Sequence, residues 1–271
     1  MPEVKTLYMD GPRLRRVLRD GPALRVLAPA CADRLYPFAR IQRVIVSGYV
    51  SWDTDALLAC AEHGVPVHFV GRDGTLRARV SNSGGPGLHL TDLADSLKGL
   101  CLRHRGLQAY QGWMDGVANY ARQRIAYELG WGSTDPQRLR RLLTEQGRRY
   151  ARTSEIRRLD RQLYGLVTVQ LDGLLRELGM DPEAAWLMDL GLSPVRDFTN
   201  ILIWDLELPK LGMLKRAWTR ARRHGRARAS LQWADAVRLF EIQLEALSRS
   251  FASTARGFHR FALDPEDHRA R

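Results

Sequence analysis

Short apolar runs dominate the first eighty residues of the chain, whereas apolar positions after residue 90 recur every three to four residues. In the first region the runs are separated by two similar turn signals, Asp10-Gly11-Pro12 and Asp20-Gly21-Pro22, as in a β-meander. These patterns predict strands over residues 4–9, 13–19 and 23–27, although the middle run also fits helical spacing.

The pattern is most regular over residues 40–80. A β-branched run ends at Gly48, an apolar helical face follows and ends at Gly64, and a tight turn then separates two further apolar runs. This order predicts a strand, a short helix and two more strands. The strands are expected over residues 43–47, 66–70 and 76–80, and the helix is capped by Ser51, Asp53 or Thr54.

Glycine and small polar residues at positions 81–87 mark a change from strand patterns to helical ones. Helices are predicted from Thr91 or Asp92 to residue 105, over residues 110–129, 135–152 and 156–178, from Asp181-Pro182 onward, and over residues 198–208 and 230–256. We therefore expect an α+β protein. It would consist of a β-rich domain over residues 1–82, a Gly-rich linker over residues 83–90, and an all-helical domain over residues 91–271.

The composition indicates a protein that folds around an ordinary core, because 45% of its residues are hydrophobic. Cys31, Cys60 and Cys101 lie far apart and lack metal-ligand spacing, which is typical of thiols in a reducing compartment. The N-terminus lacks the apolar core of a signal peptide, and no apolar run reaches the length that a membrane helix needs. The sequence thus predicts a cytoplasmic protein without a membrane partner.

The formal net charge of +12 favours a polyanionic partner such as double-stranded DNA. Only four of the 42 lysine and arginine residues are lysines, and the planar arginine fork suits phosphate contact. A GC-rich genome would also raise the arginine content, so the composition alone leaves both explanations open. No phosphate-binding loop, dinucleotide fingerprint, nucleophile elbow or zinc spacing is present.

One segment, residues 215–228, concentrates this charge, with eight cationic side chains including a histidine and one tryptophan. Phosphate neutralisation by such a segment would depend strongly on salt. The alternatives are a solvated basic face and a site for an acidic protein. The predicted DNA-contacting residues are Lys215, Arg216, Arg220, Arg222, Arg223, Arg226 and Arg228, and a second arginine cluster occupies residues 138–161.

The order of motifs over residues 40–80 resembles the N-terminal domain of CRISPR-associated protein one, the integrase and endonuclease of CRISPR spacer acquisition. The matching residues are Arg40-Ile41, Val44, Gly48, Val50-Ser51, Gly64-Val65-Pro66-Val67, Gly71 and Gly74. The resemblance implies a homodimer formed through the β-rich domains. It also implies a small ferredoxin-like partner protein and, in the helical domain, Mg²⁺ or Mn²⁺ held by a glutamate, a histidine and an acidic pair.

These ligand positions depart from the family pattern in this sequence. Asp160 falls at the glutamate position, with Glu145 as a competing candidate, and Met188 stands where the family has histidine. When Pro209 is used as the anchor, Leu202 occupies the first position of the acidic pair and Asp205 the second. A thioether is a poor ligand for magnesium or manganese, so we expect no metal site and no cofactor.

We therefore expect a member of this family that binds DNA within a CRISPR complex and has lost metal-dependent catalysis. One alternative is an active integrase that uses Asp160 or Glu145 with Asp205. Another is a protein-interaction scaffold that does not bind DNA.

Overall fold

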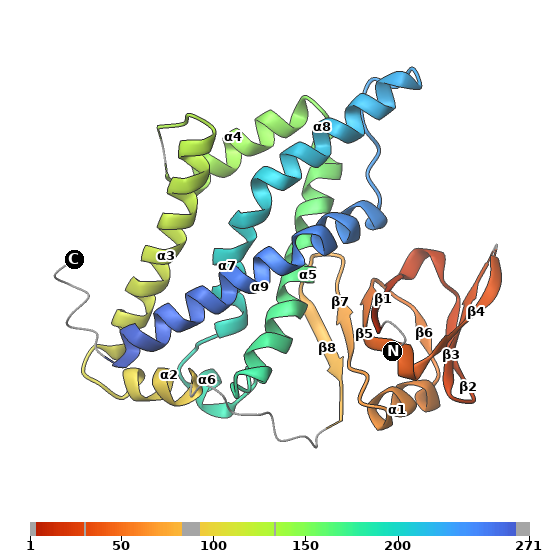
Figure 1. Ribbon diagram of the computed structural model, residues 1–271, viewed down its shortest axis with the longest axis horizontal. Helices are drawn as coiled ribbons and strands as arrows, with labels where there is room; N and C mark the ends of the chain where they lie inside the picture. The colour runs from red at the N-terminus through yellow and green to blue at the C-terminus, as the bar shows by residue number, and fades with distance from the viewer. Residues whose placement is uncertain (1–3, 30, 83–92, 133, 264–271) are drawn as a thin grey trace. The chain divides into compact units, whose positions relative to one another are not determined.

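The computed structural model describes residues 4–29, 31–82, 93–132 and 134–263, and these residues divide between two compact units, 1–86 and 87–271 (Figure 1). The N-terminal unit contains the strands and one helix, and the C-terminal unit is helical. The α+β fold expected from the sequence is confirmed. The linker predicted over residues 83–90 lies outside the described residues.

The strands of the N-terminal unit form two four-stranded sheets, with the orders β1-β5-β7-β8 and β4-β3-β2-β6. In the first sheet, β5 pairs in parallel with both β1 and β7, and β8 runs antiparallel to β7. In the second, β2, β3 and β4 form an antiparallel meander, and β6 pairs in parallel with β2. The prediction that the strand at residues 4–9 belongs to this meander is wrong, because β1 pairs with β5 in the first sheet. The strands are β1 (Lys5–Asp10), β2 (Arg16–Asp20), β3 (Ala23–Ala28), β4 (Cys31–Pro37), β5 (Ile41–Ser47), β6 (Ser51–Trp52), β7 (Val67–Val70) and β8 (Leu76–Val80).

A single apolar cluster joins the two sheets to helix α1 (Thr54–Glu62). Val44 and Val46 on β5 are fully buried, as are Ala56 and Cys60 on α1. Asp53 is the N-cap residue, and its carboxylate accepts a hydrogen bond from Arg16 Nε at 2.9 Å, so the start of α1 is tied to β2. The predicted strand, helix, strand and hairpin over residues 40–80 are confirmed.

The helical unit contains α2 (Leu93–Cys101), α3 (Gly106–Glu128), α4 (Pro136–Arg148), α5 (Thr153–Glu177), α6 (Ala185–Asp189), α7 (Pro194–Leu202), α8 (Glu207–Arg223) and α9 (Trp233–Leu263). The prediction that the first helix extends to residue 105 is wrong. Helix α2 ends at Cys101, and the chain turns through Arg105 in the left-handed region at φ 61°. A Cβ atom on Gly106 would lie 1.8 Å from the Leu100 carbonyl oxygen, so only glycine permits this close junction with α3.

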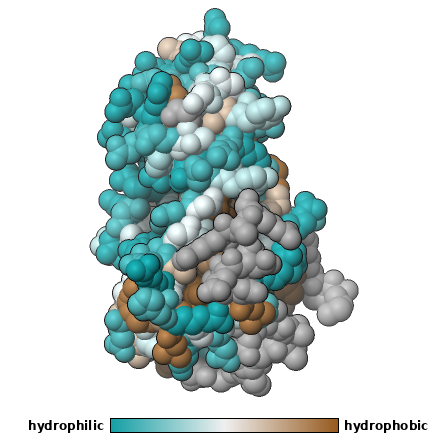
Figure 2. All heavy atoms as spheres, turned by 90° about the vertical axis from the view of Figure 1, so that its left-hand side faces the viewer, coloured by the Kyte–Doolittle hydropathy of each residue, from teal (hydrophilic) through white to brown (hydrophobic). Residues whose placement is uncertain are grey.

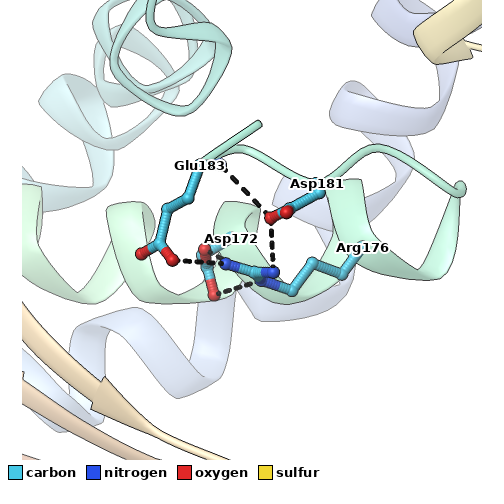
Figure 3. A network of polar contacts seen from close by, with 4 residues as sticks. All are labelled: Asp172, Arg176, Asp181 and Glu183. Atoms are coloured by element: carbon cyan, nitrogen blue, oxygen red, sulfur yellow. Dashed lines mark hydrogen bonds and ion pairs between the residues drawn. The ribbon is translucent and has the colours of Figure 1, made fainter. Parts of the chain in front are cut away.

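The segment between α5 and α7 also differs from expectation, because Asp181-Pro182 does not begin a helix. It belongs to a loop that Arg176, near the end of α5, holds in place (Figure 3). The Arg176 guanidinium contacts the Asp172 carboxylate on its own helix at 3.4 Å and Asp181 at 2.7 Å. Asp181 in turn accepts the backbone N–H of Glu183 at 3.2 Å, which fixes the approach to α6.

Helices α7 and α8 are joined by the short 3₁₀ helix η3 (Ile203–Leu206), so the chain is helical almost without interruption from Pro194 to Arg223. Pro209 lies in the first turn of α8, where its missing N–H needs no partner. The long helix α9 packs against α2 and α5. None of the helices within the described ranges has the length and apolarity to span a membrane.

The core of the helical unit is apolar and aromatic, with Phe198 of α7 and Phe251 of α9 fully buried and in edge contact at 5.4 Å between ring centroids. The face shown in Figure 2 is mainly hydrophilic, with hydrophobic residues gathered toward one end.

Candidate nucleic-acid interface

A lysine joins two carboxylates between α5 and the start of α8. The Lys210 ammonium lies 2.7 Å from Asp160 Oδ1 and 2.5 Å from Glu207 Oε2. The side chains of Lys210 and Glu207 are only 6% and 14% exposed, whereas that of Asp160 is 41% exposed. Glu207 precedes Lys210 by three residues on α8, so the two side chains share one helix face. The result is a partly buried site in which one internal cation serves two carboxylates.

Burial and charge act together in this cluster. Burial raises the pKa of Glu207, and the nearby Asp160 charge adds to the increase, although Lys210 opposes it. For Lys210, burial lowers the pKa, but the two carboxylates and their hydrogen bonds outweigh burial, so the net pKa is raised. Lys210 therefore remains a cation at neutral pH.

The other expected ligands lie apart from this cluster. Asp205 on η3 pairs with Arg124 of α3 and accepts a hydrogen bond from Ser250 Oγ of α9 at 2.7 Å. Met188 on α6 is 66% exposed, and Leu202 at the end of α7 is 2% exposed in the core.

The carboxylates therefore do not form a metal-binding constellation. Glu145, the competing candidate, is exposed on α4. Within the described ranges, no group of three or more histidine, cysteine, aspartate or glutamate side chains could hold a metal ion. The donors present do not fit a divalent metal, because the oxygens of Asp160 and Asp205 already contact cations of the chain itself.

The basic segment continues along α8 beyond this cluster. Lys215, Arg216, Arg220, Arg222 and Arg223 lie on the helix, and all five are exposed. Arg226 and Arg228 follow in the exposed chain after α8.

A groove of about 470 Å³ runs between α8 and α9. Met213 and Leu239 contribute buried apolar side chains, and Ile242 is 67% exposed. Asp235 is the one acidic residue in the lining, and its carboxylate accepts the Gln232 N–H at 2.8 Å. The cationic residues of the lining, called the groove cations below, are Lys215, Arg216, Arg220, Arg223 and Arg238.

No groove cation forms an ion pair with a carboxylate in the described part of the chain. The neighbouring Arg222 differs, because its guanidinium lies over the Trp218 ring, 5.1 Å from the centroid. Trp218 also packs against Tyr150. The groove cations are thus charged, exposed and open to an external anion.

The second arginine cluster, at residues 138–161, is partly structural. Arg148 Nε donates to Thr153 Oγ1 at 3.1 Å, and Arg158 donates to the Leu231 carbonyl. Arg140 lies over the Trp204 ring, 5.3 Å from its centroid. These contacts give three of the nine arginines a role in packing the helical unit.

Sequence reasoning missed Lys210, Glu207 and Arg238. The pairing of Glu207 with Lys210 could have been predicted locally, since opposite charges three residues apart lie on one helix face. Asp160 could not, because it precedes Lys210 by 50 residues in the sequence. Arg238 joins the groove only because α9 packs beside α8, a contact that no local pattern reveals.

Comparison with known proteins identifies the architecture. The fold defines a class of two-domain α+β proteins in which a strand-rich unit precedes a helical one. The sequence profile of the family described as "CRISPR associated protein Cas1" matches residues 12–93. This match covers most of the N-terminal unit, and the resemblance found in residues 40–80 is confirmed.

Solved structures agree with this assignment at the level of fold. A CAS1 protein from Thermotoga maritima matches with a TM-score of 0.57 and 10% sequence identity, over 80% of this chain and 79% of that chain. A casposase bound to integration product matches with a TM-score of 0.52 and 12% identity, over 79% and 73% of the two chains. No curated protein matches the sequence significantly.

Proposed function

We propose that this chain is an integrase-like, DNA-binding subunit of CRISPR spacer acquisition or of a related CRISPR complex, and that it has lost metal-dependent strand transfer. The observation that carries the DNA-binding part is the groove between α8 and α9 with five exposed cations, none of which pairs with a carboxylate among the described residues. The match to the Cas1 family profile supplies the context, because it covers most of the N-terminal unit. The casposase with the same fold is bound to integration product, which supports DNA as the ligand of this chain.

The groove suits a phosphate backbone for two physical reasons. Four of its five cations are arginines, which contact phosphate through two parallel N–H groups. Its apolar side chains offer a surface on which the aliphatic stems of these arginines can rest while the charged ends reach outward. If each groove cation neutralises one phosphate, the slope of log K against log salt is about −4.5.

The loss of strand transfer rests on the positions that the family resemblance assigns to metal ligands. Asp160 contacts Lys210, Asp205 contacts Arg124, and Met188 offers an exposed thioether. Activation of a hydroxyl nucleophile by a divalent metal needs free oxygen or imidazole donors. We propose that this chain holds DNA without joining it.

The proposed assembly follows the resemblance as well. We propose a homodimer formed through the N-terminal units, acting with a small ferredoxin-like partner or other CRISPR-associated subunits. Light scattering of the purified chain tests the homodimer, and a monomer across micromolar concentrations would exclude it.

DNA binding is tested by fluorescence polarisation with a labelled duplex between 50 and 200 mM salt. We expect the wild-type affinity to fall by about 500-fold over this range, from the slope of about −4.5. The variant Arg220→Ala/Arg223→Ala should reduce the steepness of the slope by about 1.8, and Arg238→Ala should reduce it by about 0.9.

The matched control removes two arginines that already pair with carboxylates of the N-terminal unit. Arg19 lies 3.7 Å from Glu62, and Arg77 lies 2.5 Å from Asp73. Arg19→Ala/Arg77→Ala should keep the wild-type slope within about 0.5. An equal loss in both double variants would show that only net charge matters, and undetectable binding by the wild type would favour the protein-interaction scaffold.

Strand transfer is tested with a duplex carrying 3′ hydroxyl ends, a supercoiled target and Mn²⁺. We expect no joined product from the wild-type chain. Joining that requires Mn²⁺ and disappears in Asp205→Ala, while DNA binding persists, would refute the loss of catalysis and establish the active integrase instead.

A further inference from the structure

The Lys210 ammonium sits where two carboxylates converge. It contacts Asp160 Oδ1 at 2.7 Å and Glu207 Oε2 at 2.5 Å, and its residue is only 5% exposed. Asp160 comes from α5 and Glu207 from the first turn of α8, so the ammonium also joins two helices. A cation thus lies between two oxygen ligands drawn from separate elements, which is the arrangement a bound metal ion commonly has.

The ammonium and a divalent ion cannot share this position. Oxygen ligands lie about 2.0–2.1 Å from Mg²⁺, so an ion bridging the two carboxylates would overlap the nitrogen that already lies within hydrogen-bond distance of both. The ammonium is also covalently attached to α8 and is present in every folded molecule. An external ion would therefore have to displace a buried, tethered cation before it could bind.

The negative charge of Glu207 requires a cation at this position. The Glu207 side chain is only 14% exposed, and a carboxylate this far from water is destabilising without a partner. In this chain the partner is supplied by the polypeptide itself. The cluster is consequently independent of metal, and a divalent ion is not needed to hold α5 and α8 together.

We infer that Lys210 fills the cation position between Asp160 and Glu207 and closes it to divalent metal ions, and that removing the ammonium turns this carboxylate pair into a Mn²⁺-binding site. The inference deepens the proposed loss of metal-dependent catalysis and rests on that proposal, because Asp160 is the residue that the family resemblance places at a metal-ligand position. It does not depend on DNA binding.

The test measures Mn²⁺ binding to the full chain without DNA, by the loss of the free-ion signal in electron paramagnetic resonance. Lys210→Ala should bind one more Mn²⁺ per chain than the wild type, at least about tenfold more tightly than any wild-type site. One or two carboxylates together with several waters are a common ligand set for a small divalent ion. Adding Asp160→Asn to Lys210→Ala should abolish the gain. The matched control Lys98→Ala removes an exposed lysine from α2 of the same unit and should bind Mn²⁺ as the wild type does.

Thermal unfolding supplies a second readout and a safeguard against misfolding. Lys210→Ala should unfold at a lower temperature than the wild type, and Mn²⁺ should recover part of that loss while leaving the wild-type midpoint unchanged. If the alanine variant does not fold, Lys210→Gln keeps a long polar side chain without the charge and is measured in the same way.

Two outcomes would overturn the inference. One is Mn²⁺ binding by the wild type that Asp160→Asn abolishes, because the position would then be open to metal despite the lysine. The other is a folded Lys210→Ala or Lys210→Gln variant without a gain in Mn²⁺ binding. Both measurements lack DNA, so they separate a failure of this inference from a failure of the proposed DNA-binding function.

Discussion

Replacement of Arg176 by alanine is the perturbation that best tests how the loop before α6 is held. Its guanidinium contacts Asp172 at 3.4 Å, Asp181 at 2.7 Å and Glu183 at 3.7 Å (Figure 3). The three carboxylates differ in exposure, since Asp172 is 3% exposed while Asp181 and Glu183 are 58% and 73% exposed. The energetic consequence is therefore concentrated at Asp172.

The magnitude follows from these exposures. Removing one partner of a buried ion pair costs about 3–5 kcal/mol, whereas exposed pairs contribute about 0.2–1 kcal/mol each. Arg176 is itself 25% exposed, its contact with Asp172 is long, and Asp172 makes a further polar interaction, so we expect Arg176→Ala to lose about 1–2 kcal/mol of unfolding free energy, between these two ranges. For a domain the size of the helical unit, this corresponds to a decrease of about 2–8 °C in the unfolding midpoint.

The assay is thermal and urea unfolding followed by circular dichroism at a wavelength that reports helix. The control Arg249→Ala removes an arginine that is 73% exposed and pairs with Glu245 at 3.5 Å, and it should change stability by at most about 0.5 kcal/mol. The double variant Asp172→Asn/Arg176→Met removes both buried charges and should be more stable than Arg176→Ala. The reasoning is refuted if Arg176→Ala is no less stable than the Arg249 control, or if the double variant is as unstable as the single one.

Three further predictions concern single groups. Burial raises the pKa of Asp197 above its ordinary value of 3.8, so ionisation of this carboxyl opposes folding increasingly as the pH rises above that value. The variant Asp197→Asn can still accept the hydrogen bond of the Tyr110 hydroxyl. It should therefore be more stable than the wild type at pH 7 but not at pH 3. Burial also raises the pKa of Cys60 to about 11, and mass spectrometry should find this thiol unmodified by iodoacetamide at pH 8 in native protein and modified in denaturant. Gly147→Leu should lose about 2 kcal/mol of unfolding free energy in urea, because a Cβ atom at this position would lie 3.0 Å from an isoleucine carbon of α5. Gly116→Ala, where a Cβ atom would meet open space on the helix surface, should gain about 1 kcal/mol.

Local turn chemistry made most of the N-terminal unit predictable. Gly48 and Gly64 end their elements at φ 83° and 67°, a conformation that few other residues adopt, so the sequence marks both ends. Strand β4 was missed because its side chains give no buried stripe: four consecutive residues from Ala32 to Leu35 are exposed at the edge of the second sheet. The parallel pairing of β1 with β5 was also hidden, since their partners lie more than thirty residues apart.

The helical unit shows where periodicity stops being informative. Leu102 continues the apolar spacing of α2 yet is 81% exposed, so the pattern extends a helix that the chain has already ended. The candidate site depends on the same long-range information. Asp160 looks like a surface acid in its own helix, and its partnership with Lys210 exists only because the fold brings the start of α8 to this point of α5.

Helix α8 has a local reason to be basic at its end, which weighs on the interpretation of the groove. Arg220, Arg222 and Arg223 occupy the last turn, where cations are favoured by the helix dipole, so their presence alone does not require an external ligand. Arg238 has no such reason. It lies in the second turn of α9, near the helix N-terminus, where the dipole offers a cation no advantage. Arg238 faces the cations of α8 across the groove and forms no ion pair among the described residues. Repulsion between these like charges opposes the packing of α8 against α9 unless an anion lies between them. Arg238 is therefore the residue that distinguishes a groove built for phosphate from a helix end that is merely basic.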